Sequence, residues 1–440
     1  MQRSANMSTK LLNYFVGLAF ISLVLILGFW VERGDFLSLQ LLYLGCFALY
    51  LFAYRNAQSP HDVNLFIGVA IVARLLLIGS FPNLSDDIYR FFWDGKLWHA
   101  GINPFDALPS HYAEQGFPKG LNQTLYDQLN SPNYFTIYPP IAQFIYYIAT
   151  FTSDVYRSAI VMKLFLFAAE VGSIWLLIRL IKHQGMEEKS VLLYVLNPLI
   201  VVELMGNLHF EGVMIFFVLL SYWWLQKGWQ RLSAVAFAFS VATKLLPLIF
   251  LPFLIHKLGW KKSLQYFVIV GVVTVALFWP LFGSFFIENF GKSLNLYFQK
   301  FEFNASLYYV FRWLGYQVYG YNLISVFGPL LALMAGTIIF AKAIQEKSKG
   351  LKNLPEQWLW AIIIYLLCTT TVHPWYITLP ILLSIFTNYR FPIVWSALIF
   401  LTYVNYSYEP YFENLWVVAL EYSLVLAYLI HELRLNRRFQ

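Results

Sequence analysis

Long apolar runs alternate with short polar breaks along almost the whole chain. The first three runs, at about residues 11–30, 36–54 and 63–81, each come close to the ~20 residues that a helix needs to cross a bilayer. A polar segment over 82–136 follows them before the chain becomes apolar again. This pattern predicts an all-α polytopic membrane protein with a large outer loop after its third span.

Further apolar runs fill the chain from residue 158 onward. We predict spans at about 158–180, 189–206, 212–226, 231–243, 246–258, 263–287, 318–341, 356–372, 374–388, 391–407 and 414–433. Together with the first three they give about 14 transmembrane helices, several of them short for a bilayer. The chain is then expected to have three parts: N-terminal spans (1–81), an outer loop with juxtamembrane helices (82–157) and a transmembrane core (158–440).

The run IYPPIAQFIYYIATF, residues 137–151, decides the orientation of everything that follows it. If this run crossed the membrane, Arg179 and Lys182 would lie outside. Lys and Arg are enriched in cytoplasmic loops, so this outcome is disfavoured. We therefore predict that the run lies in the interface as a short helix, with Pro139 and Pro140 at its start.

Composition and charge agree with a membrane protein. Hydrophobic residues make up 59% of the chain and charged residues only 12%, whereas about 25% is usual in soluble domains. The net charge of +7 comes from bases at span ends, so we expect membrane lipids and no nucleic acid as partners. Cys46 and Cys368 lie in apolar runs without metal-ligand spacing.

The most unusual polar stretch is NLSDDIYRFFWDGKLWHAGINPF, residues 83–105, directly after the third span. It places Asp86 and Asp87 among aromatic residues, with Arg90 about one turn further on. A solvated loop could also contain two adjacent aspartates. An acid held at the membrane boundary is nevertheless suited to act as a base toward a sugar hydroxyl. We predict that both aspartates are catalytic and that Arg90 binds substrate or supports the loop.

Other polar residues at the outer ends of spans are candidates for substrate binding. They are Asn207, His209, Glu211, Lys244, Asn304, Arg312, His373, Trp375 and Tyr376. Each has a structural alternative: Glu211 suits a helix N-terminus, Lys244 could extend to the interface, and His373 could serve a helix turn before Pro374. No metal site is predicted among them, although a divalent ion near Asp87 and Glu211 is left open.

Several of these stretches resemble a known family. SDDIYRFFWDGKLWHAGINPF is similar to the outer-loop motif of bacterial polyprenyl-phosphate-sugar-dependent glycosyltransferases in the glycosyltransferase C superfamily, especially mannosyltransferase-like members. LNPLIVVELMGNLHFEGVMIFFVLL, ATKLLPLIFLP, FNASLYYVFRWLG and TTTVHPWYITLP look like further blocks of that family in the same order. The resemblance covers roughly residues 63–407.

The resemblance implies an inverting transfer of a hexose, mannose by family, from a polyprenyl-phosphate donor to a lipid or glycan acceptor. Transfer would take place on the extracytoplasmic side of a bacterial inner membrane and would require no cofactor. By motif position, Asp86 is the general base and Asp87 its acidic neighbour, while His209 and Glu211 fall in a second acidic region. The alternative is a transporter or flippase for a lipid-linked sugar, a class that often has repeated halves and polar sites near the bilayer midplane.

Overall fold

The computed structural model describes residues 2–438, with side chains for residues 10–295 and 300–436. Helices dominate, and within this part of the chain the only β pairing is an isolated parallel bridge between Phe303 and Thr371. The all-α class predicted from the sequence is therefore confirmed. The chain forms two compact units, each built from separate stretches of sequence.

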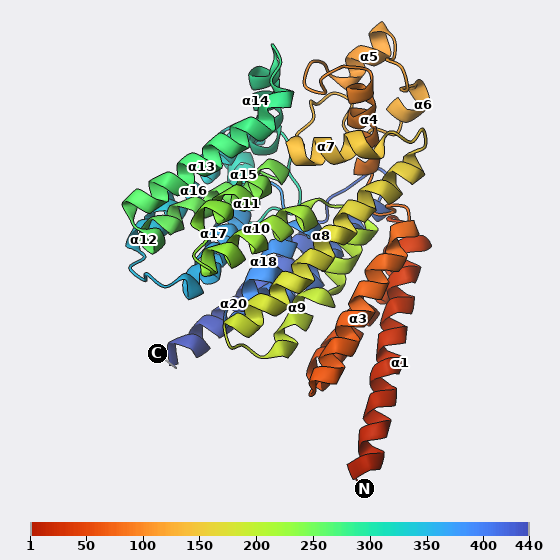
Figure 1. Cartoon of the computed structure of the whole chain (residues 1–440). Coiled ribbons are helices and arrows are strands. Elements are labelled where there is room, and N and C mark those ends of the chain that lie inside the picture. Colours follow the sequence, from red (N-terminus) through yellow and green to blue (C-terminus); the bar gives the residue numbers. More distant parts are fainter. Residues whose placement is uncertain (1, 439–440) are drawn as a thin grey trace. The chain divides into compact units, whose positions relative to one another are not determined.

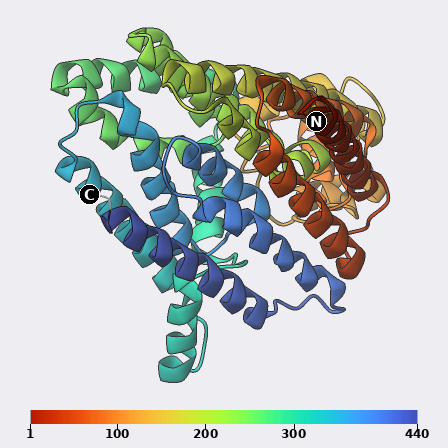
Figure 2. The ribbon, with the colours of Figure 1, turned by 90° about the horizontal axis from the view of Figure 1, so that it is seen from below.

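The first unit comprises Met1–Ser85, Lys163–Gly212 and Pro374–Gln440. Its helices are α1 (Gln2–Phe29), α2 (Phe36–Asn56), α3 (Pro60–Leu76), η1 (Leu77–Gly79), η2 (Glu188–Val191), α9 (Leu192–Val195), η3 (Ile200–Gly206), η7 (Pro374–Ile377), α18 (Thr378–Ser384), α19 (Phe391–Leu398), η8 (Ile399–Ser407) and α20 (Leu415–Arg438). Helices α1 and α3 run side by side (Figure 1), and α20 packs along α19 (Figure 2).

The second unit comprises Asp86–Met162 and Val213–His373. Its helices are α4 (Asp87–His99), α5 (Pro109–Gln115), α6 (Gln123–Tyr126), α7 (Pro140–Ala149), α10 (Glu211–Gln226), α11 (Gln230–Thr243), η4 (Leu246–Phe253), α12 (Leu254–Leu258), α13 (Trp260–Phe278), η5 (Trp279–Leu281), α14 (Phe286–Gln299), α15 (Leu307–Tyr319), α16 (Ile324–Gln345), η6 (Leu351–Asn353) and α17 (Leu354–Cys368). Helices α4 to α7 form a separate group within it (Figure 1). Helix α8 (Val155–His183) begins in this unit and continues into the first, and the first two residues of α10 belong to the first unit.

Seven helices in the described part of the chain are long and apolar enough to cross a membrane. They are Lys10–Phe29, Phe36–Asn56, Pro60–Gly79, Val155–His183, Trp260–Leu281, Ile324–Gln345 and Leu415–Asn436. An eighth crossing is possible if the bent pair Glu188–Val195 and Ile200–Gly206 is one span. The chain is thus an integral membrane protein. The count of about 14 stays a prediction, because most of the other expected spans correspond to apolar helices of 10–17 residues.

The bent pair owes its break to the sequence Leu196-Asn197-Pro198-Leu199. Pro198 has no N–H to donate, and its ring clashes with the preceding turn, so the helix axis changes direction by 52°. Asn197 replaces part of the lost bonding: its Oδ1 accepts from the Leu199 N–H at 3.0 Å, and its Nδ2 donates to Ser396 Oγ at 3.0 Å. The broken backbone is therefore buried in protein rather than exposed to lipid.

Two short helices differ in how well the sequence predicted them. Helix α7 begins at Pro140 and has only 10 residues, too few to cross a bilayer, which agrees with the interfacial helix predicted over 137–151. The aromatic stretch 301–316 also predicts an interfacial helix, but α15 begins only at Leu307. Residues before it are extended because the Phe303 N–H donates to Thr370 O and the Val372 N–H donates to Phe303 O, which pairs this segment with residues 370–372.

Charged side chains inside the first unit are paired. Arg74 of α3 donates from Nε to Glu170 Oε2 of α8 at 3.0 Å, and Tyr194 OH donates to Glu170 Oε1 at 2.8 Å. The Lys163 ammonium donates to the carbonyls of Leu77 and Ser80 and to the Ser80 hydroxyl, at 2.7–3.1 Å. Lys163 thus satisfies the carbonyls where η1 ends. Charged residues in or near apolar runs normally face the protein interior, so the sequence predicts the burial of all three but not their partners.

We expect Arg74→Met to destabilise the protein by about 3–5 kcal/mol, because it leaves the buried Glu170 carboxylate uncompensated. Thermal unfolding in detergent measures the loss. The matched control is Lys182→Met, since Lys182 forms an exposed pair with Glu188 at 3.2 Å that is worth about 0–1 kcal/mol. Equal effects of the two substitutions would contradict a role of the buried pair in holding α3 against α8.

Candidate functional site

The acidic motif stands at the start of α4. Asp86 occupies the N-cap position and Asp87 the first turn, where the helix dipole favours negative charge. Both side chains are half-buried, and Asn130 Nδ2 donates to Asp87 Oδ1 at 3.0 Å. Burial and the charge of Asp86 raise the pKa of Tyr89, so this phenol keeps its proton at neutral pH. The two aspartates are therefore presented by a fixed helix terminus rather than by an irregular loop.

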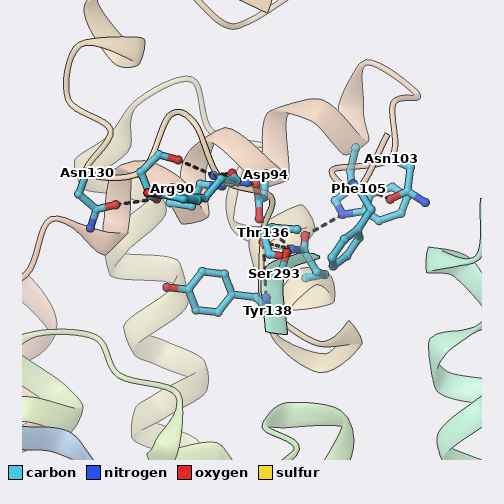
Figure 3. A network of polar contacts seen from close by, with 12 residues as sticks. Arg90, Asp94, Asn103, Phe105, Asn130, Thr136, Tyr138 and Ser293 are labelled. Atoms are coloured by element: carbon cyan, nitrogen blue, oxygen red, sulfur yellow. Dashed lines mark hydrogen bonds and ion pairs between the residues drawn. The ribbon is translucent and has the colours of Figure 1, made fainter. Parts of the chain in front are cut away.

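A polar network holds that helix in place (Figure 3). Arg90 donates from Nε to Asp94 Oδ1 at 2.9 Å and from Nη1 to the carbonyls of Ser131 and Tyr134 at 3.3 and 2.9 Å. Asp94, which is fully buried, also accepts from Gln143 Nε2 of α7 at 2.8 Å. Arg90 thus ties α4 to the segment that follows Asn130, which favours the supporting role over substrate binding.

Helix α4 can approach α7 closely because residue 95 is glycine. A Cβ at Gly95 would lie 2.6 Å from Tyr146 O and 2.4 Å from Thr150 Oγ1, so any larger residue would push the helices apart. The next residue, Lys96, donates to the carbonyls of Thr150 and Thr152, both at 2.8 Å, beyond the end of α7. Burial lowers the pKa of Lys96. Arg90 and Lys96 therefore both serve to assemble this helical group.

A second polar cluster in the same unit surrounds Glu302. Arg312 donates to Glu302 from Nη1, and Tyr308 OH donates to Glu302 Oε2 at 2.5 Å. Asn322 Nδ2 adds a bond to Glu302 Oε2 at 3.2 Å. Burial opposes the charge on Arg312, but Glu302 outweighs it, and the pKa of Arg312 is raised. Glu302 therefore already neutralises Arg312, one of the predicted substrate-binding residues, and the sequence did not point to this acid.

The β bridge brings three of the predicted residues into one region of the second unit. Asn304 is fully buried and has a positive φ of 47°, directly after the paired segment that contains Phe303. His373 follows the other paired segment, and its ring lies against Phe303 with centroids 4.8 Å apart. Arg312 joins this region through its bond to Glu302. Lys244 lies elsewhere along the chain, half-buried at the C-terminal end of α11.

In the first unit, Glu203 of η3 gathers several predicted residues around one buried carboxylate. Tyr403 OH donates to Oε1 at 2.7 Å, Asn207 Nδ2 donates to Oε2 at 3.3 Å, and His209 Nε2 lies 3.4 Å from Oε2. Trp375 stacks on the His209 ring with centroids 3.6 Å apart. The sequence predicted Asn207, His209 and Trp375 but missed the acid at their centre.

The remaining predicted residues lie near this cluster in the sequence. Glu211 is buried and is the first residue of α10, as expected for an acid that complements a helix dipole. Tyr376 forms an edge contact with Trp375, with ring centroids 6.2 Å apart. Among the described residues, no group of three or more His, Cys, Asp or Glu side chains is arranged to hold a metal ion.

The two acids that the sequence reading missed, Glu203 and Glu302, could have been noticed as single charges within apolar or aromatic runs, a signal that the search for hydrophobic periodicity does not use. Glu203 interrupts the apolar run LNPLIVVELMGN and Glu302 interrupts an aromatic run, FQKFEFNA. A single acid in an apolar run is costly to bury and is therefore a candidate for a specific partner. Their partners, Tyr403 and Arg312, are 200 and 10 residues away, so only Glu302 could have been paired by proximity.

These features define the class of the protein. It is an integral membrane protein in which two adjacent carboxylates stand at the start of a rigid helix, shortly after a membrane span in the sequence. The profile of the family described as alpha-(1->6)-mannopyranosyltransferase, N-terminal domain, matches residues 16–259, which is 244 of the 440 residues. The chain belongs to this family. The mannosyltransferase-like family predicted from the motifs is thereby confirmed.

A curated relative gives a weaker match over part of the chain. Alpha-(1->6)-mannopyranosyltransferase A of Mycobacterium tuberculosis (strain ATCC 25618 / H37Rv) is 25% identical over 197 residues, which are 44% of this chain and 36% of the relative. The match thus spans about a third of the relative's length. No solved structure matches the chain.

The supporting role of Arg90 can be tested with Arg90→Met. Loss of its bonds should speed amide exchange in residues 130–136 by ~10-fold or more, because each buried bond to a charged group is worth about 1.5–3 kcal/mol. Hydrogen exchange with mass spectrometry measures this, with the exposed Lys119→Met as control. Unchanged exchange together with a raised donor KM would instead assign Arg90 to substrate binding.

Proposed function

We propose that the protein transfers mannose from a polyprenyl-phosphate carrier to a glycan or glycolipid acceptor on the extracytoplasmic side of the membrane. The observation that carries this proposal is the position of Asp86 and Asp87 at the start of α4, within the region that matches the mannosyltransferase family. A base must be held in a defined orientation to be efficient. The bonds of Arg90 and Asp94 give α4 that rigidity.

A lipid-borne donor fits the distance between the aspartates and the membrane. The third candidate span ends at Gly79, seven residues before Asp86. Seven residues span at most about 25 Å even when fully extended, so Asp86 lies within that distance of the membrane boundary at which the span ends. The phosphate of a polyprenyl carrier lies at that depth, and its sugar would project toward the acidic motif.

In the proposed reaction, Asp86 removes the proton from the acceptor hydroxyl while its oxygen attacks the anomeric carbon of mannose. The new glycosidic bond forms as the bond from that carbon to the carrier phosphate oxygen breaks, which inverts the configuration. Cationic groups stabilise the departing phosphate. Lys244 and His373 are the proposed ligands, since Asp94 and Glu302 already neutralise Arg90 and Arg312.

Asp86→Asn tests the base directly. The amide cannot accept the proton, so kcat should fall by about 10²–10⁴-fold while the protein still folds. The assay follows radiolabelled mannose from polyprenyl-phosphate mannose into product in proteoliposomes. Asp127→Asn is the matched control, because Asp127 is exposed and accepts only a local bond from Gln123 at 2.7 Å. Near-normal turnover in both Asp86→Asn and Asp87→Asn would overturn the mechanism.

The donor class can be tested in the same proteoliposomes. We expect mannosylated product with polyprenyl-phosphate mannose and none with a nucleotide sugar alone, because the proposed site binds a donor whose phosphate is carried by a membrane lipid. Mannose transfer from the soluble nucleotide sugar would contradict the lipid donor. Movement of lipid-linked mannose across the bilayer without glycoside formation would favour transport over transfer.

A further inference from the structure

Glu203 has no part in the proposed chemistry, yet it is one of the most completely enclosed acids in the first unit. It lies in η3, just after the break at Pro198, with an exposed fraction of 0%. A carboxylate among membrane helices is costly and persists where fixed donors compensate it. This cost suggests that Glu203 holds a neighbouring segment of the chain in place.

The donors to Glu203 come from its own helix end and from a distant helix. Tyr403 of η8 bonds Oε1 at 2.7 Å, while Asn207 bonds Oε2 at 3.3 Å. The His209 backbone N–H also returns to Glu203 O at 3.4 Å, and between these residues Leu208 adopts a positive φ of 67°. The segment after η3 therefore turns back onto Glu203, with the His209 ring nitrogen Nε2 3.4 Å from Oε2, in a backbone conformation that a leucine rarely adopts.

The Asn207 side chain links Glu203 to the segment around Leu84. While its Nδ2 donates to Glu203, its Oδ1 accepts from the backbone N–H of Leu84 at 3.2 Å. Leu84 is 3% exposed, and only Ser85 separates it from Asp86. Glu203, Asn207 and Leu84 thus form a continuous tether that ends two residues before the proposed base.

We infer that Glu203 is a positioning residue that fixes the chain leading into Asp86 by orienting the Asn207 amide. This inference rests on the proposed function, in which Asp86 is the base. Glu203 contacts neither substrate nor reacting atoms. Its carboxylate selects the amide orientation in which Nδ2 faces the acid and Oδ1 faces Leu84, because only a donor can face a carboxylate.

Two substitutions separate the need for an acceptor from the need for a charge. Glu203→Leu removes the acceptor, so the amide loses its preferred orientation and kcat should fall by ~100-fold, the cost of a displacement of about 1 Å at a reacting group. Glu203→Gln keeps an oxygen for Asn207 while the Tyr403 hydroxyl turns to accept from the new amide. It should retain kcat within about fivefold.

The tether also predicts which measurements stay unchanged. Donor KM should change by less than about threefold in Glu203→Leu, because a displaced base affects the chemical step rather than binding. Asn207→Ala should reproduce the loss in kcat, and the double variant should be no worse than either single one. Amide exchange in residues 81–88 should rise in both. If Glu203→Leu does not fold, Asn207→Ala carries the same test.

Glu421→Leu is the matched control, since Glu421 is equally buried in the same unit and accepts from Trp395 Nε1 at 2.7 Å. It should keep kcat within about threefold. Equal losses in the two leucine variants, or a Glu203→Gln enzyme as inactive as Glu203→Leu, would overturn the tether. Asp86→Asn is assayed in parallel. If Asp86→Asn is inactive while Glu203→Leu has normal turnover, the proposed base stands and only the tether is wrong. If Asp86→Asn is active, the proposed base is wrong, and so is the tether that rests on it.

Discussion

The cost of enclosing charge among membrane helices governs how this protein is built. An ionised side chain removed from water needs fixed partners, or it destabilises the fold by several kcal/mol. Glu170 receives Arg74 and Tyr194, Glu203 receives Tyr403 and Asn207, and both acids are fully buried. Each carboxylate joins segments distant in sequence. The acids therefore determine which helices must lie together, in addition to the apolar packing.

The same constraint applies in the helical group that carries the acidic motif. Asp94 is buried between Arg90 and Gln143, and removing Arg90 would leave this buried carboxylate without a compensating charge. Arg90 lies about one turn, and Asp94 a little over two turns, from Asp86, which is half-buried at the start of the same helix. The two kinds of acid differ in their surroundings: Asp94 is enclosed by hydrogen-bond partners and supports the helix, whereas the half-buried acids at the helix start are the ones to which the proposed function assigns the chemistry.

The sequence predicted the fold class and the family well because both depend on signals along the chain. Apolar run length identified the first three spans and the short helix α7, and the motif around Asp86 identified the family. It could not supply pairings such as Glu203 with Tyr403, which are 200 residues apart. It also missed that residues before Leu307 are extended, because their bonding partners lie near Thr370. Non-local contacts decided both.

The broken helix in the first unit bears on the choice between a transferase and a transporter. Transporters place substrate and ions at interrupted helices, where unwound backbone and acids face a cavity. Here the interruption at Pro198 is filled by Asn197, which bonds Leu199 and Ser396, and the acid beyond it, Glu203, has no exposed surface. Donors from the protein itself take the place that a ligand would occupy. The interruption is therefore closed by hydrogen bonds within the protein, unlike the cavity-lining interruptions of transporters.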